Sequence, residues 1–149
     1  MWRRLIGRAR RDDGAALIEA AFTLPLMLFI CIGILEFGRA YQAWQVVTNA
    51  SREGARVAVL PGSTDAGVTA RVTTYLAAGV LTKPETAQVL IARDATVSLG
   101  GALTAAATKV TVEYPFQFIV LQPIAQLMAK DSAVGEAFTM RAITTMRNE

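Results

Sequence analysis

The stretch that decides the fold is Ala15–Leu35, AALIEAAFTLPLMLFICIGIL, in which Glu19 is the only charged residue among 21 positions. As an α-helix it would be about 31 Å long, which matches the hydrocarbon core of a bilayer. The core helix of a soluble protein is seldom apolar on every side. The stretch therefore predicts one membrane-spanning helix.

Basic residues gather just before this stretch. Five arginines precede Gly14, accompanied only by Asp12 and Asp13, and together they carry the whole net charge of +3. By the positive-inside rule such a flank stays in the cytoplasm, so the remainder lies across the membrane. From Ala15 onward ten basic and ten acidic residues cancel, so the net charge does not indicate nucleic-acid binding.

Length and composition limit what the rest of the chain can do. The 149 residues suffice for one domain besides the span. Cys31 is the only cysteine and lies within the span, where we interpret it as a small packing residue; no disulfide can form within the chain. There is no histidine, which removes the commonest general base and metal ligand. Asp94 and Glu113 are candidate catalytic carboxylates, but no pattern in the sequence brings them together. We expect no enzymatic activity, cofactor, metal or small-molecule substrate.

The helical pattern continues beyond the span. Apolar side chains recur at helical spacing at Phe37, Tyr41, Trp44 and Val47. We expect one unbroken helix to about Leu60, stopped by Pro61-Gly62. Within it, Glu36 and Arg39 are spaced i,i+3 and are expected to mark the membrane–water boundary.

A second helix is predicted over residues 65–80, with Ser63, Thr64 or Asp65 as its cap and Lys83-Pro84 as its end. The apolar stripe of this helix is Val68, Val72, Tyr75, Leu76 and Val80.

Strands are predicted for most of the remainder. Residues 87–92 and 95–99 are expected to precede a turn at Gly100-Gly101. Residues 109–114 alternate, with Val110, Val112 and Tyr114 on one face and Lys109, Thr111 and Glu113 on the other. Pro115 is expected to interrupt this strand, after which Phe116, Phe118 and Val120 resume the alternation. Residues 123–134 are read as a short helix or a loop, and 138–146 as the last strand.

These elements predict an α+β fold. Three or four antiparallel strands would bury their apolar face on the second helix and on the outer half of the first. The expected division is a basic leader (1–14), a transmembrane helix (15–36) and an extracytoplasmic domain (37–149).

Glu19 calls for an explanation, because a carboxylate inside an apolar span costs about 2.5 kcal/mol or more. It can lie near the cytoplasmic edge and reach water. Alternatively, a basic leader, Gly14 and a helix with glutamate at its fifth position resemble a type IV prepilin, which a membrane peptidase cuts after the glycine. The resemblance implies cleavage between Gly14 and Ala15. The new ammonium group at Ala15 of one subunit could then pair with Glu19 of the next.

Residues 13–60 as a whole resemble the TadE-like proteins, minor pilin-like components of the bacterial tight-adherence, or Flp, pilus system. The segments that carry the resemblance are 14–20, Pro25, 33–39 and 50–56. Ala20 follows Glu19 where Flp pilins carry Glu-Tyr, and Flp pilins are much shorter, so the likeness is to a minor pilin rather than to the major one.

The resemblance implies a pilin-like pseudopilin subunit that serves pilus assembly and cell adhesion. Its expected partners are the membrane, a prepilin peptidase, and other pilin and minor pilin subunits of the Tad system. Its expected location is the inner membrane, with the domain in the periplasm, or the pilus itself. An uncleaved, permanently anchored binding or scaffold module remains the alternative. Arg52, Glu53 and Arg56 form either a solvated helix face or a surface for partner subunits.

Overall fold

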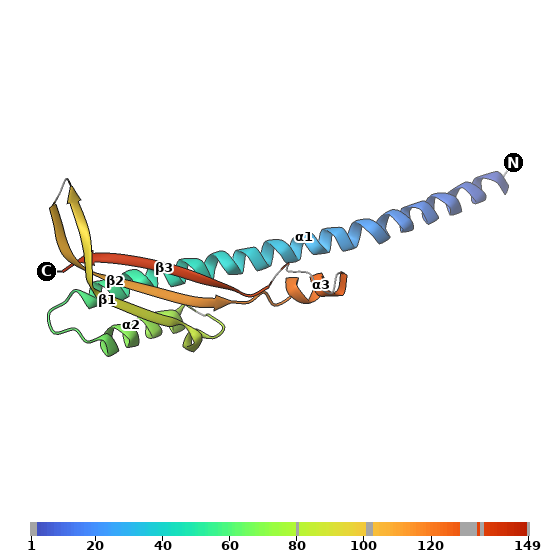
Figure 1. Cartoon of the computed structure of the whole chain (residues 1–149). Helices are drawn as coiled ribbons and strands as arrows, with labels where there is room; N and C mark the ends of the chain where they lie inside the picture. Colours follow the sequence, from blue (N-terminus) through green and yellow to red (C-terminus); the bar gives the residue numbers. More distant parts are fainter. Residues whose placement is uncertain (1–2, 80, 101–102, 129–133, 135, 149) are drawn as a thin grey trace.

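One long helix organises the molecule. The computed structural model describes residues 3–79, 81–100, 103–128, 134 and 136–148. Figure 1 shows helix α1 (Arg3–Ala58) running the length of the molecule; its N-terminal half projects alone and its C-terminal half carries the other elements. These elements are α2 (Asp65–Ala78), the 3-10 helix η1 (Pro84–Thr86), β1 (Gln88–Gly100), β2 (Leu103–Phe116), α3 (Leu121–Met128) and β3 (Phe138–Arg147). The expected α+β fold class is confirmed.

Helix α1 is continuous through Gly14 and Pro25, and it ends two residues before the predicted position at Leu60. At about 1.5 Å per residue its 56 residues extend roughly 84 Å. Gly62 lies in the turn that follows and has a φ of +77°, a conformation that glycine adopts at little cost. The predicted stop at Pro61-Gly62 is therefore confirmed.

The face of α1 that packs on the domain is lined by small side chains. Buried residues recur at helical spacing at Ala40, Ala43, Val47, Ala50 and Ala58. The aromatic stripe that predicted the helix lies on another face, because Phe37, Tyr41 and Trp44 are 62%, 65% and 44% exposed. Alanine on the inner face lets the sheet approach the helix axis closely.

Helix α2 begins where the sequence predicts and ends earlier. The Thr64 hydroxyl accepts a hydrogen bond from the Gly67 backbone N–H, 3.2 Å away, which makes Thr64 the cap. The stripe is confirmed for Val68, Val72 and Leu76, which are buried, and for the partly buried Tyr75, whereas Val80 lies outside the described residues. The expected end at Lys83-Pro84 is wrong. The helix stops at Ala78, and a Cβ added at Gly79 would overlap Val46 of α1, so the chain turns where it meets α1. Pro84 opens η1 instead.

The described residues form one sheet of three antiparallel strands in the order β1-β2-β3. The two strands expected over 87–92 and 95–99 are a single strand, because a register shift between Ala92 and Ala95 bends β1 without ending it. Beyond this bulge the β1–β2 hairpin turns away from the rest of the sheet (Figure 1). Gly100 has a φ of +111°, as suits a turn, while Gly101 lies outside the described residues.

The predicted faces of residues 109–114 are confirmed. Val110, Val112 and Tyr114 are buried in the core together with residues of α1 and α2. Thr111 is on the opposite face, yet only 3% exposed, because its cross-strand partners Leu90 and Ile143 flank it.

Pro115 does not interrupt β2. It lies opposite Thr139 of β3, and β1 begins only at Gln88, opposite Glu113, so no strand needs a donor from β2 on that side. The expected continuation through Phe118 and Val120 is wrong, because β2 ends at Phe116.

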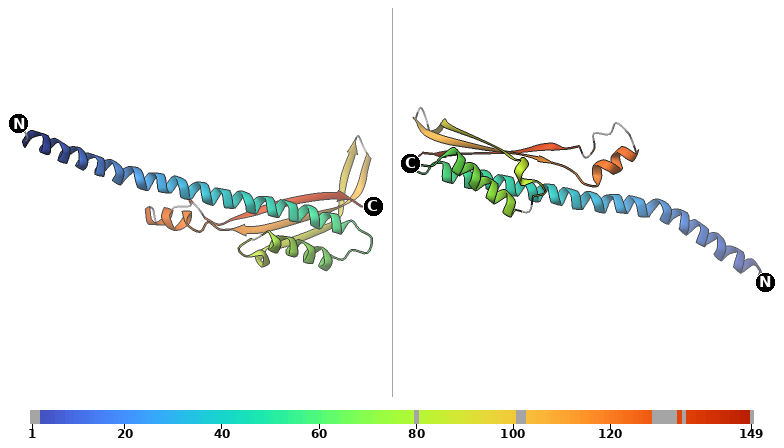
Figure 2. Two further views of the ribbon diagram at one scale, coloured as in Figure 1. Left: turned by 180° about the vertical axis from the view of Figure 1, so that it is seen from behind. Right: turned by 90° about the horizontal axis from the view of Figure 1, so that it is seen from below.

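The segment between β2 and β3 contains helix α3, the helical alternative for residues 123–134, of which 129–133 lie outside the described residues. Figures 1 and 2 show α3 beyond the end of the sheet, beside α1 and on the side of the N-terminus. Strand β3 confirms the predicted last strand.

Candidate functional site: helix α1 and its attachment points

The N-terminal half of α1 offers a bare apolar surface. Among the described residues it is the one helix long and apolar enough to cross a membrane, with a mean hydropathy of 2.3 over its most apolar window and none of that window buried. Gly14, Ala15 and Glu19 all lie in regular helix near the start of this surface. The structure therefore leaves the predicted processing site and assembly residue uncovered.

Glu19 is exposed on this helix. Its backbone carbonyl accepts a hydrogen bond from the Thr23 hydroxyl at 2.7 Å, a contact that does not involve its carboxylate. Within the described part of the chain, the carboxylate of Glu19 forms no ion pair. Any cation that meets it must come from another molecule or from residues whose side chains are not described.

Glu36 also lies on α1, but unlike Glu19 it is buried. It is 6% exposed, and its Oε2 atom accepts hydrogen bonds from Arg39 Nη2 at 3.0 Å and from the Ile119 backbone N–H at 3.1 Å. Arg39 also donates to the Gln117 carbonyl at 2.6 Å. The pair thus fastens α1 to the loop between β2 and α3.

Aromatic rings surround this attachment. The Arg39 guanidinium lies 4.5 Å from the centroid of Phe116, a distance suited to a cation–π contact. Phe118 packs edge-on against both Phe116 and Phe37, with centroids 5.2 and 6.0 Å apart, and Phe138 closes the cluster. The end of the sheet nearest the apolar half of α1 is therefore held by a polar clasp, Glu36–Arg39–Ile119, set among aromatic rings.

A second attachment lies near the other end of α1, within residues 51–56. Ser51 Oγ and Thr144 Oγ1 are 2.8 Å apart and join α1 to β3. Glu53 Oε1 accepts from Arg71 Nη2 at 2.7 Å and from its Nε at 3.1 Å, which joins α1 to α2. The hydrogen bonds from Arg71, supported by the positive charges of Arg71 and Arg56, lower the pKa of Glu53 below its ordinary value.

Gly54 is required for this packing. A Cβ built on it would lie 2.6 Å from Val72 Cγ2 and 3.3 Å from Val110 Cγ1. Helix α1 therefore meets α2 and β2 at a point where only hydrogen fits.

The two arginines of this segment remain accessible. Arg56 lies 3.7 Å from Glu53, as its i,i+3 spacing predicts, and its side chain is 73% exposed. Arg52 is exposed and donates to Asn49 Oδ1 at 3.3 Å. Of the three candidate interaction residues, Glu53 is engaged inside the molecule, whereas Arg52 and Arg56 face outward.

Comparison with protein-family models finds a match for most of this helix. Residues 14–56 match the family model described as TadE-like protein. The N-terminal segment is TadE-like. The resemblance expected from residues 13–60 is thereby confirmed over residues 14–56. Searches of curated proteins and of solved structures find no match.

The TadE-like segment coincides with α1, from Gly14 almost to its end, and so covers a little under a third of the chain. It contains one side of each attachment: Glu36 and Arg39 of the clasp, and Glu53 and Gly54 at the outer end. The opposite sides, such as Ile119 and Arg71, lie in the domain beyond it.

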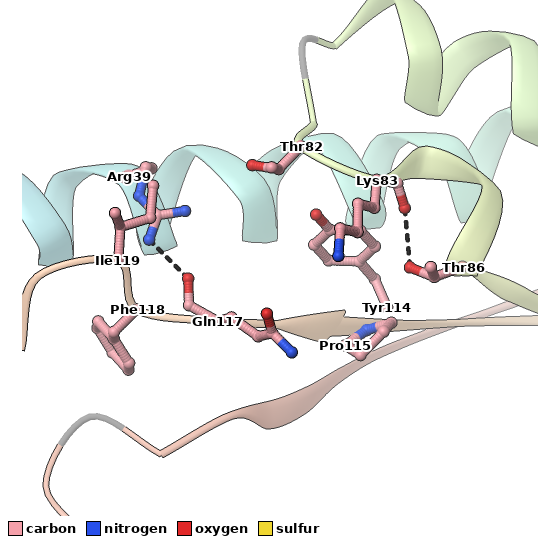
Figure 3. A pocket seen from close by; sticks show the side chains of 9 residues that line it. All are labelled: Arg39, Thr82, Lys83, Thr86, Tyr114, Pro115, Gln117, Phe118 and Ile119. Atoms are coloured by element: carbon pink, nitrogen blue, oxygen red, sulfur yellow. Dashed lines mark hydrogen bonds between the residues drawn. The ribbon is translucent and has the colours of Figure 1, made fainter. Parts of the chain in front are cut away.

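A cleft of about 250 Å³ opens beside the clasp, lined by residues of α1, of β2 and the loop after it, and of η1 and the two positions before it. In Figure 3, Arg39 turns toward the Gln117 carbonyl at one end of the cleft, and Lys83 and Tyr114 lie at the other. Thr86 is occupied locally, since its hydroxyl donates to the Lys83 carbonyl at 2.8 Å.

The candidate catalytic carboxylates do not meet. Glu113 lies opposite Gln88 and pairs with Arg141 at 3.2 Å, whereas Asp94 lies at the β1 bulge, six residues or about 20 Å further along the strand. In the described part of the chain no group of three or more His, Cys, Asp or Glu residues could hold a metal ion.

The sequence did not reveal the partners of Glu36 and Arg39. Their i,i+3 spacing places the two side chains within reach of each other, but Gln117 and Ile119 contribute backbone atoms, which leave no trace in residue type. The sequence did contain one indication that this segment packs against another element. Residues 114–129 contain no charged side chain, which is unusual for a fully solvated loop.

Proposed function

We propose that this protein is a membrane-anchored pseudopilin, or minor pilin, that serves assembly of a Tad (Flp) pilus. The observation that carries the proposal is a TadE-like helix, bare over its apolar half, with an exposed carboxylate five positions after Gly14. The chain sits in the inner membrane with its arginine-rich end in the cytoplasm and its domain in the periplasm. A prepilin peptidase removes residues 1–14.

Cleavage and assembly are linked through charge. Cutting after Gly14 removes the cationic flank and creates an ammonium group at Ala15. In lipid, Glu19 of one subunit then pairs with the Ala15 ammonium group of a neighbouring pilin or minor pilin, which offsets the cost of a lone buried carboxylate. Glu19 thereby favours the assembled over the isolated helix and sets the register between neighbours. No catalytic group, cofactor or nucleic acid takes part.

A permanently anchored scaffold is the second candidate. It is favoured by the continuity of α1, which runs through Gly14 without a break. In this form the arginines keep the helix in place, the chain stays uncleaved, and Glu19 can be replaced without consequence.

The decisive experiment is the intact mass and N-terminal sequence of the chain isolated from cells that make the pilus, with and without the peptidase. We expect residues 1–14 to be missing only when the peptidase is present. Gly14→Leu should block cleavage without disturbing the fold, because nothing lies within 4 Å of a Cβ at this position. An uncleaved wild-type chain in piliated cells would reject processing.

Glu19→Leu tests the assembly step in the same cells. The exposed position should tolerate the change, so insertion and cleavage persist while pilus assembly fails. Ala21→Leu is a matched control, since it places the same side chain at another exposed position of the same helix, two residues away. Normal assembly with Glu19→Leu would support the scaffold instead.

A further inference from the structure

We propose that α3 and the loop before it form an interfacial helix that lies in the outer leaflet of the membrane beside α1. The partner is the bilayer itself, contacted a second time at a site remote in sequence from the span. The proposal rests on the proposed membrane anchoring by α1.

The exposed fractions of residues on α1 indicate which part of this helix α3 lies against. Phe29, Ile32, Gly33 and Glu36 are spaced as one helix face and are less exposed than their neighbours, falling from 40% at Phe29 to 6% at Glu36. Adjoining residues on other faces, such as Leu28 and Leu35, are 64% and 73% exposed. Helix α3 contacts α1 and lies beside it on the N-terminal side of the sheet (Figure 2), so we infer that α3 accounts for the reduced exposure of this face.

The depth follows from the helix rise. Glu36 is the last residue of the predicted transmembrane segment, and Phe29 lies seven residues, or about 10 Å, further into it. Interfacial helices rest about 5–10 Å into the boundary between headgroups and acyl chains. When α1 spans the membrane, α3, lying beside α1 between Glu36 and Phe29, is therefore at the depth of an interfacial helix.

The side chains of this region suit lipid. Leu121 and Ala125, one turn apart, are buried and form the inner face of α3. Leu127 and Ile119 point outward and are 87% and 60% exposed, although both are large and apolar. No residue from 114 to 129 is charged, so nothing in the segment resists entry into the headgroup region.

The clasp holds this second contact in position. Ile119 donates its backbone N–H to Glu36, and Phe118 packs on Phe37. Two backbone polar groups of the loop that would be costly to expose to lipid, the Ile119 N–H and the Gln117 carbonyl, thus find partners on α1.

Fluorescence quenching by lipid tests the placement in the full chain. A bimane label on the native, exposed Cys31 reports anchoring by α1. In a Cys31→Ser background, Leu127→Cys and Ile119→Cys report α3, and Leu103→Cys is the control, because Leu103 is 70% exposed at the far hairpin. Each protein is reconstituted into phosphatidylcholine–phosphatidylglycerol vesicles with and without a doxyl group near the top of the acyl chain.

We expect the labels at residues 31, 127 and 119 to lose about half of their fluorescence to the doxyl lipid, as befits side chains at that depth, and the label at 103 to lose none. Quenching at 31 without quenching at 127 and 119 would overturn the proposal while leaving the anchor intact, as when another protein chain covers α3. Absence of quenching at 31 would overturn membrane anchoring and the placement of α3 together.

Discussion

Glu19 and Glu36 show that one residue type can have very different surroundings on the same helix. Both are glutamates on α1, yet Glu19 is exposed without a cation in the described part of the chain, whereas Glu36 is 6% exposed and accepts two hydrogen bonds. A carboxylate near lipid persists only if something compensates its charge. The chain supplies that compensation for Glu36 itself, and under the proposed function the compensation for Glu19 comes from another subunit.

Replacing Glu36 should weaken the clasp. Glu36→Leu removes the acceptor of both Arg39 and the Ile119 N–H, and we expect a loss of about 1–3 kcal/mol in the free energy of unfolding. Glu36→Gln retains an acceptor for the N–H and should lose less. Chemical denaturation in detergent micelles measures both variants, and faster amide exchange at Ile119 should accompany the larger loss. Equal stability of Glu36→Leu and the wild type would show that the clasp contributes nothing.

At the scale of elements, close approach rather than large side chains joins α1 to the domain. The buried positions of α1 are mostly alanine, and Gly54 lies where α1 meets both α2 and β2. The large aromatic side chains of the same helix stay outside. The sequence indicated the helix through its aromatic spacing, but it did not reveal which face the sheet would choose.

Gly54→Ala tests this contact. The added methyl would lie 2.6 Å from Val72 Cγ2, and overpacking of this kind costs about 1–3 kcal/mol. Gly38→Ala is the matched control, because nothing lies within 4 Å of its Cβ, and it should stabilise the helix by about 0.5–1 kcal/mol. Thermal unfolding compares the two.

Shortening Val72, the side chain opposite Gly54, tests whether overpacking causes the loss of stability in Gly54→Ala. Val72→Ala in the Gly54→Ala background should recover part of the loss, since it removes the atom that the new methyl meets. If the double variant is no more stable than the sum of the two single changes predicts, the contact at Gly54 is not the cause.

At the scale of the whole molecule, the two halves of α1 have different surroundings. Its N-terminal half offers an apolar surface to a membrane, while its C-terminal half supplies a large share of the domain core, including Val47, Ala50 and Ala58. Domain and anchor are therefore not separable at the end of α1, and a folding unit must begin within the helix.

Truncation should reveal that boundary. A chain that begins at Glu36 retains the core face of α1 and should unfold cooperatively on heating. A chain that begins at Pro61 lacks that face, leaves β2 and α2 without their main partner, and should not fold. Circular dichroism with temperature distinguishes the two, and a folded chain beginning at Pro61 would show that α1 is dispensable for the domain.

The sequence by itself determined the features that depend on neighbours along the chain. The apolar run, the stop at Pro61-Gly62, the presence of a capping residue within residues 63–65 and the alternation through residues 109–114 follow from helix and strand periodicity and from local backbone chemistry. The family resemblance likewise lies within one continuous helix.

The tertiary structure decided everything that depends on residues distant in the sequence. It alone joined Glu36 to Ile119, 83 positions away, turned the small side chains of α1 inward, ended α2 where it meets Val46, and allowed Pro115 in a strand by leaving one side unpaired. The physical reason is that burial and hydrogen-bond partners are properties of surfaces that meet in space, and no period in the sequence encodes which surfaces meet.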